Sequence, residues 1–161
     1  MRPYDRAMDE LLRIHSLTVE LPATAGWVRP VNEVTLRIAP GEAVGLVGES
    51  GSGKTMLSLA LMGLLPPGAR ASGEAFLSAA DGHRKTLANL SEPERREVRG
   101  REIAMIFQEP MTSLNPVLRI GAQIKEAIHA HEPGLQRSVI ARRVMAALEQ
   151  AAVPEPDSSP Y

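Results

Sequence analysis

The spacing of apolar and polar residues predicts two amphipathic strands near the start of the chain. Residues 11–21 alternate in part and residues 31–38 alternate again, with residues 22–30 expected to form a loop between them. Residues 43–47 are continuously apolar, which is typical of a strand buried on both faces. The pattern therefore predicts an antiparallel sheet laid beside a parallel core.

The remainder of the chain mixes helical periodicity with further strand patterns. Residues 56–65 predict a helix that Pro66, Pro67 and Gly68 bring to an end. A strand at 73–79 is expected to turn at Asp81-Gly82 into a hairpin partner at 83–87. A capping box at 91–94 predicts the start of a short helix. The last expected elements are a second buried strand at 103–107 and helices at 120–128 and 140–151. Strands and helices together indicate an α/β fold.

A glycine-rich stretch lies between the expected strand 43–47 and the helix 56–65. It fits the phosphate-binding loop pattern G-x-x-x-x-G-K-[ST] at every position, in the strand–loop–helix context that the motif requires. Its glycines let several backbone N–H groups approach one phosphate, and the helix N-terminus adds partial positive charge. Lys54 is expected to reach the β- and γ-phosphates, and the Thr55 hydroxyl to ligate Mg²⁺. The candidate nucleotide-binding residues are Gly48, Glu49, Ser50, Gly51, Ser52, Gly53, Lys54, Thr55 and Met56.

Composition narrows the classes of protein that this pattern allows. The chain has 161 residues, 43% of them apolar, a net charge of −1 and no cysteine. It therefore has no basic field for nucleic acid, and disulfides and thiolate metal sites are excluded. Because no apolar run is long enough to span a bilayer, we expect a cytoplasmic protein that reaches a membrane only through a partner. The histidines are not spaced as a metal site.

Two further residues are candidates for contacting the nucleotide or its Mg²⁺ because of their positions. Gln108 follows the expected strand 103–107, where a parallel sheet presents ligand-contacting side chains. With the phosphate loop upstream, we favour a role for Gln108 in contacting Mg²⁺ and the attacking water. Trp27 is expected at the tip of the loop 22–30, where it either stacks on an adenine ring or covers the loop as a hydrophobic cap. The sequence leaves both roles of Trp27 open.

Together these motifs resemble the ATP-binding subunits of ABC transporters, and more narrowly the dipeptide, oligopeptide and nickel importer group. The resemblance covers residues 11–153 and is carried by the glycine loop, by Met62-Gly63-Leu64-Leu65-Pro66, and above all by Ile106-Phe107-Gln108-Glu109-Pro110-Met111-Thr112-Ser113-Leu114-Asn115-Pro116. It implies an incomplete ABC-type P-loop NTPase fold with an antiparallel β subdomain, part of the parallel core sheet and the start of the helical subdomain. The implied segments are a flexible N-terminus at 1–10, the ATP-binding domain portion at 11–153, and a disordered end at 154–161. Within 11–153 lie the P-loop 48–55, the Q-loop 108–116 and a helical segment 117–152.

The resemblance also implies a function and partners. In such subunits ATP and Mg²⁺ are held between two nucleotide-binding domains whose closure drives transport, and Gln108 would be the catalytic Q-loop residue. The implied partners are transmembrane permease subunits, a second ATP-binding subunit and, indirectly, an extracytoplasmic solute-binding protein, with no nucleic acid. The implied location is peripheral, on the cytoplasmic face of the inner membrane. The transported solute stays open among peptides, nickel and related small solutes.

The sequence also departs from this family, since its signature motif, Walker B carboxylates and switch histidine are absent. We therefore expect the N-terminal half of an ATPase, with apolar surface and strand edges left open. Without a general base it should hydrolyse ATP hardly at all, and we expect weak, Mg²⁺-assisted nucleotide binding at best. The alternative is a non-catalytic remnant or partner-binding module. A soluble P-loop enzyme such as a small kinase is disfavoured by the segment 108–116.

Overall fold

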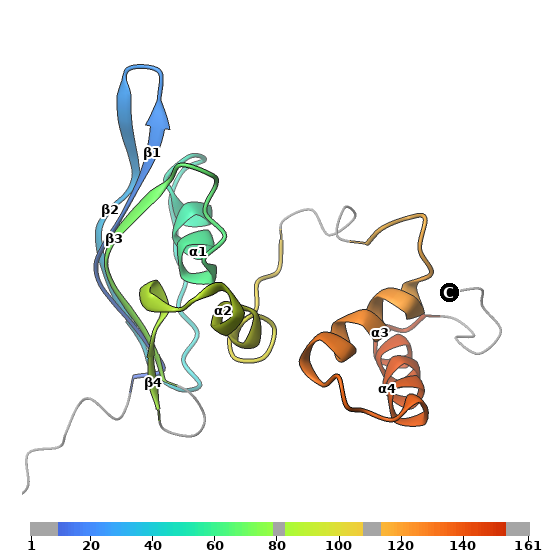
Figure 1. Cartoon of the computed structure of the whole chain (residues 1–161). Helices are drawn as coiled ribbons and strands as arrows, with labels where there is room; N and C mark the ends of the chain where they lie inside the picture. The colour runs from blue at the N-terminus through green and yellow to red at the C-terminus, as the bar shows by residue number, and fades with distance from the viewer. Residues whose placement is uncertain (1–9, 79–82, 108–113, 154–161) are drawn as a thin grey trace, which may run out of the picture. The chain divides into compact units, whose positions relative to one another are not determined.

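The computed structural model describes residues 10–78, 83–107 and 114–153, which form two compact units divided between Met105 and Ile106 (Figure 1). Several expectations fall on residues outside these ranges, namely those for the two chain ends, for the turn at Asp81-Gly82 and for Gln108.

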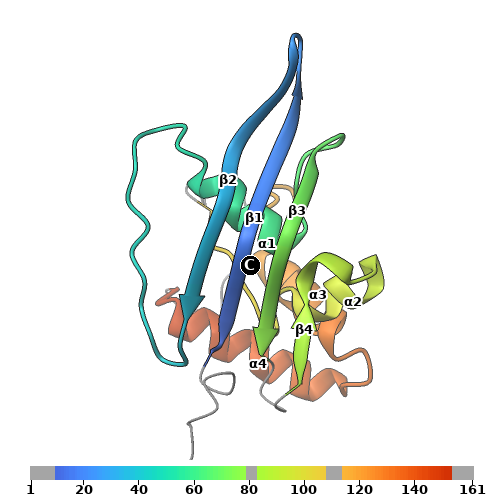
Figure 2. The ribbon, with the colours of Figure 1, turned by 90° about the vertical axis from the view of Figure 1, so that its left-hand side faces the viewer.

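A four-stranded antiparallel sheet is the framework of the first unit. Its strands are β1 Leu12–Ala23, β2 Gly26–Ile38, β3 Arg70–Ser78 and β4 Arg84–Thr86, in the order β2-β1-β3-β4 (Figure 2). The strands expected from the alternating pattern are thus confirmed, and so is the antiparallel pairing of the 73–79 region with its hairpin partner.

The prediction of a loop at 22–30 is wrong, because the paired strands β1 and β2 extend through most of this range. Strand pairing runs as far as Ala23 opposite Gly26, through the apolar pair of Leu21 and Val28. Apolar and β-branched side chains that face one another across two strands stabilise the ladder. This cross-strand pairing outweighs the local turn signals of the proline and glycine residues on which the expectation of a loop rested.

Helices cover one face of this sheet. They are α1 Lys54–Met62, the 3-10 helix η1 Leu87–Asn89 and α2 Glu92–Val98, and both α-helices agree with the sequence prediction (Figures 1 and 2). The buried core joins the sheet to these helices, and full burial of a Val, Leu or Ile side chain contributes about 1.5–3 kcal/mol. Its members are Leu12, Ile14, Leu17, Val19, Val31, Leu57, Ala75, Leu77, Leu87 and Val98.

The two continuously apolar runs do not form the buried strands that were expected. Residues 43–47 belong to the open loop that connects β2 to α1 (Figure 2), and Val47 is 95% exposed. In the second run Ile103 makes only an isolated bridge to Arg99, and Ile106 is 94% exposed. A buried strand needs neighbours on both sides to satisfy its backbone N–H and C=O groups. None of the strands that the structure describes pairs with either run, so the expected open apolar surface is confirmed while the strands are not.

The second unit contains a pair of packed helices, α3 Ile120–His131 and α4 Arg137–Gln150. Both agree with the helical spacing in the sequence, and α4 buries Ile140 and Leu148. The start of α3 is tied to the preceding turn by Gln123, whose side chain accepts the Asn115 N–H at 2.8 Å and donates to the Asn115 carbonyl at 3.0 Å. Among the described residues no helix has the length and apolarity that crossing a bilayer requires.

Candidate phosphate-binding site

Gly53 fixes the phosphate loop between β2 and α1. It is the N-cap residue directly before α1 and has the left-handed conformation with φ of 87°, which is far less costly for glycine than for other residues. A Cβ atom at this position would lie 1.9 Å from the carbonyl oxygen of Pro30, so the loop backbone rests directly on β2. The strand therefore sets where the helix starts.

The ammonium group of Lys54 closes the loop on itself. Its Nζ donates to the carbonyl oxygen of Gly48 at 2.6 Å, to that of Glu49 at 2.7 Å and to Ser52 Oγ at 2.9 Å. An ammonium has three N–H donors, so these contacts use its full capacity. The charge is thereby held against the loop backbone instead of extending into solvent.

The N-terminus of α1 is open to an anion. The first hydrogen bond of the helix joins the Leu57 N–H to the Gly53 carbonyl at 2.9 Å, so the N–H groups of Lys54, Thr55 and Met56 precede it. No side chain caps this end and no acidic residue lies in its first turn. The partial positive charge of the helix end thus faces the same loop as the Lys54 ammonium.

The residues of the loop fit a nucleotide phosphate with its magnesium ion. A Cβ at Gly48 would lie 2.6 Å from Ser52 Oγ and 3.7 Å from Lys54 Nζ, so the absence of a side chain there keeps the cradle open. Thr55 is exposed at the helix start and carries a hydroxyl oxygen, the hard donor type that Mg²⁺ prefers. The donors are therefore backbone N–H groups, one ammonium and one hydroxyl.

A hollow of about 310 Å³ borders this loop on its inner side. Asn32, Ser52 and Lys54 form its polar part, and most of the remaining lining is apolar, including Val31, Leu46 and Leu57. Apolar walls of this kind offer few partners to a phosphate. The polar cradle and the apolar hollow are therefore neighbouring but chemically distinct.

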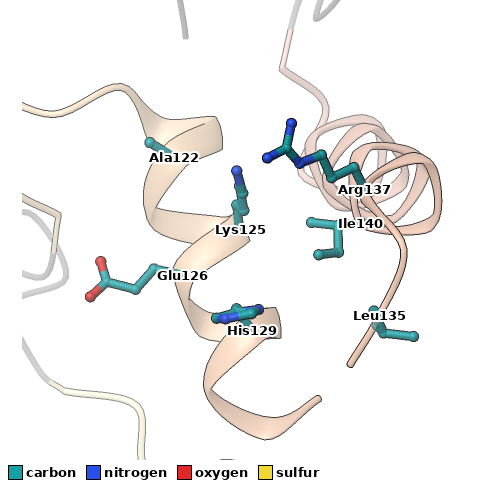
Figure 3. A pocket seen from close by; sticks show the side chains of 7 residues that line it. All are labelled: Ala122, Lys125, Glu126, His129, Leu135, Arg137 and Ile140. Carbon is teal, nitrogen blue, oxygen red and sulfur yellow. The ribbon is translucent and has the colours of Figure 1, made fainter. Parts of the chain in front are cut away.

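A second hollow, of about 530 Å³, lies on the second unit between α3 and α4. Figure 3 shows Lys125 and Arg137 directed toward one another across it, while Glu126 points away. Leu135 and Ile140 supply apolar lining. This hollow has cationic side chains but no glycine loop, so its chemistry differs from that of the phosphate cradle.

The structure brings the residues from Gly48 to Met56 together in one loop and helix start, but it does not describe Gln108. Trp27 lies in β2 and is 45% exposed, with the Arg70 guanidinium 4.0 Å from its ring centroid. One face of the indole is thus already occupied by a cation–π contact. No sequence pattern signals this contact or the Pro30 carbonyl beneath Gly53, because in each case the two partners are distant in the chain.

Comparisons with known proteins agree with these features. The family model described as "ABC transporter" matches residues 31–159. The dipeptide transport ATP-binding protein DppD of Escherichia coli (strain K12) is 41% identical over 92% of this chain and 44% of its own length. The oligopeptide transport ATP-binding protein OppD of Bacillus subtilis (strain 168) is 39% identical over 91% of this chain and 40% of its own length. The chain thus spans less than half the length of these curated relatives.

Among solved structures, this chain is similar to the ATP-binding cassette MJ0796, a dimer in a post-hydrolysis state bound to ADP and Pi. The similarity has a TM-score of 0.68 at 22% sequence identity, and it covers 89% of this chain and 58% of that chain. At that identity the comparison establishes a shared fold.

Proposed function

Because the chain belongs to the ABC transporter family, we propose that it binds the phosphates of ATP as part of the ATP-binding subunit of a peptide-type importer. The observation that carries this proposal is the position of the Lys54 ammonium, which lies within the loop ahead of an uncapped helix N-terminus. Both groups favour negative charge at the same place.

Each part of the loop has a separate task in this proposal. Backbone N–H groups from Ser50 to Met56 hold phosphate oxygens, and Lys54 exchanges at least one loop oxygen for the β- and γ-phosphates. The Coulombic attraction between an ammonium and an anionic phosphate oxygen exceeds its attraction to a neutral carbonyl oxygen, which favours this exchange. Thr55 would hold Mg²⁺, which neutralises charge on the phosphates. Gln108 is proposed, from its motif alone, to contact Mg²⁺ and the attacking water.

The partners and location follow from the relatives and stay part of the proposal. DppD and OppD are named as ATP-binding proteins of dipeptide and oligopeptide transport. By analogy, this chain would act on the cytoplasmic face of the membrane with permease subunits and a second ATP-binding subunit. A solute-binding protein outside the cytoplasm would deliver a peptide or a related small solute, with nickel still open.

Binding of MgATP by the full chain tests the proposal. A titration monitored by calorimetry should show saturable binding that requires Mg²⁺, and Lys54→Ala should weaken it at least about tenfold, or about 1.4 kcal/mol. Lys125→Ala is the matched control, since it removes a lysine from the hollow on α3 and α4 and should leave the affinity unchanged. Steady hydrolysis is not expected, because the sequence contains no Walker B carboxylates.

The same experiment distinguishes ATP binding from the main alternative, a non-catalytic module. Equal affinities for Lys54→Ala and the unchanged chain would refute phosphate binding by this loop. A chain that unfolds cooperatively on heating yet binds no nucleotide would instead favour a non-catalytic module that binds a partner.

A further inference from the structure

The C-terminal end of α1 is held by the side chain of one residue. Arg99 Nε donates to the Met62 carbonyl at 2.8 Å, and Arg99 Nη2 donates to the Gly63 carbonyl at 2.9 Å. The third nitrogen, Nη1, lies 2.9 Å from Glu92 Oε1 on α2. The planar guanidinium thus satisfies two carbonyl oxygens at the negative end of α1 and joins that end to α2.

A second guanidinium lies against the same helix end. Gly63 closes α1 with φ of 63°, and a Cβ there would lie 1.7 Å from Arg95 Nη1. Arg95 is itself fixed by donating from Nε to the Leu90 carbonyl at 2.9 Å. Arg99 thus forms hydrogen bonds to the helix end, while Arg95 occupies the space beside it.

Apolar contacts hold α1 against the core, but they do not fix its position along its own axis. The helix spans nine residues, or about 13 Å, in which Leu57 and Met62 are buried and Met56, Ala60 and Leu61 are partly buried against the core. Apolar contacts are non-directional, so they resist sliding or tilting of a short helix less than hydrogen bonds of fixed geometry do. The position of α1 is therefore defined by Pro30 beneath its first turn and by Arg99 at its last.

We propose that Arg99 is a positioning residue for the phosphate loop. By fixing the carbonyl end of α1, it fixes where the N–H groups at the other end point, and it couples the loop to α2. The inference rests on the proposed binding of ATP phosphates at Gly48 to Met56. The side chain of Arg99 is 20% exposed and reaches the loop only through α1.

The test compares two arginines of the same region in the full chain. Arg99→Gln should weaken MgATP binding about fivefold to tenfold at a temperature where circular dichroism shows the variant folded. Arg96→Gln is the matched control: it makes the same chemical change at a 78% exposed arginine that contacts Glu92. It should change the affinity less than twofold. Arg99→Lys keeps the charge but not the planar fork, so an intermediate affinity is expected.

A second readout does not depend on nucleotide. Amide hydrogen exchange should accelerate in α1 of Arg99→Gln while the rates in β1 and β3 stay unchanged, a pattern that general destabilisation would not give. Unchanged exchange in α1, or equal affinities for the Arg99 and Arg96 variants, would overturn the inference. If the unchanged chain binds no MgATP, the proposed function fails, and the exchange rates of α1 still decide whether Arg99 positions the helix. If Arg99→Gln does not fold, the same comparison is made with Arg99→Lys.

Discussion

At the scale of single residues, Gly53 meets two constraints that both exclude a side chain. Its backbone is in the left-handed conformation, and the Pro30 carbonyl occupies the place of a Cβ. The first constraint follows from the glycine loop motif, whereas the second comes from a strand that is distant in sequence. A substitution at Gly53 should therefore disturb both the loop and its support.

Gly53→Ala should destabilise the first unit by about 2–3 kcal/mol, because backbone strain of about 1–3 kcal/mol adds to a clash that neither backbone can avoid. It should also abolish MgATP binding. Urea unfolding followed by circular dichroism measures the first effect, and Gly134→Ala is the control, since a Cβ there meets nothing within 4 Å. A Gly53 variant as stable as the Gly134 variant would contradict the contact with Pro30.

A second residue-scale feature shows how a sheet accommodates like charges. Arg13 of β1 lies directly opposite Arg37 of β2, an arrangement that is unfavourable by itself. Glu10 compensates, since its carboxylate lies 3.2 Å from Arg37 and 3.9 Å from Arg13, and it also lies 3.1 Å from Arg84. Because strand register decides which arginines meet, the charge pattern of the sequence alone did not reveal this group.

At the scale of elements, α2 begins as its sequence predicts. The Glu94 carboxylate accepts a hydrogen bond from the Ser91 N–H at 2.7 Å, and the Ser91 side chain accepts from the Glu94 backbone in return, which is the capping-box arrangement expected from the spacing of these residues. The Ser91 hydroxyl also donates to the Glu94 carboxylate. Hydrogen bonds from Ser91 lower the pKa of Glu94 below its ordinary value of 4.5. The hydrogen bond from Arg99 likewise lowers the pKa of Glu92.

These shifts predict an acid-dependent loss of stability. A carboxyl whose pKa is lowered by folding stabilises the folded state above its unfolded pKa, and that stability is lost as the pH falls through the folded pKa. The melting temperature should therefore fall as the pH is lowered below about 4.5, the ordinary value for both groups, toward their lowered pKa values. Glu94→Gln should flatten part of this profile, whereas Glu97→Gln on the same helix serves as the comparison. Identical profiles for the two variants would count against the capping box as a source of the pH dependence.

At the scale of the whole molecule, exposed apolar segments are the main departure from an ordinary globular chain. Residues 43–47 expose Val44 at 41%, Leu46 at 52% and Val47 at 95%, next to the phosphate loop. Contiguous apolar surface with an unpaired backbone promotes association with other chains. The full chain should therefore self-associate as its concentration rises.

Val47→Ser should reduce this self-association, as measured by sedimentation velocity across a range of concentrations. The control is Val28→Ser, which changes a valine that is 55% exposed but lies opposite Leu21 in the paired hairpin. A similar reduction in both variants would show that general hydrophobicity, and not the unpaired segment, drives association.

The sequence by itself determined those parts of this protein that depend on neighbouring residues. The phosphate-loop motif, the capping box of α2, the helices α3 and α4 and the alternation of β1 and β2 all follow from interactions within a few positions of the chain. The comparisons then confirmed the ABC transporter family that these motifs resembled.

Only the tertiary structure decided the features that need a distant partner. Leu21 facing Val28 turned an expected loop into strand, and the Pro30 carbonyl placed Gly53. The apolar run 43–47 has the composition of a buried strand, yet composition does not supply the neighbouring strands that would satisfy its backbone. Nothing in the sequence singles out Arg99, and folding alone brought its guanidinium to the end of α1, because hydrogen bonds of fixed geometry require both partners in place.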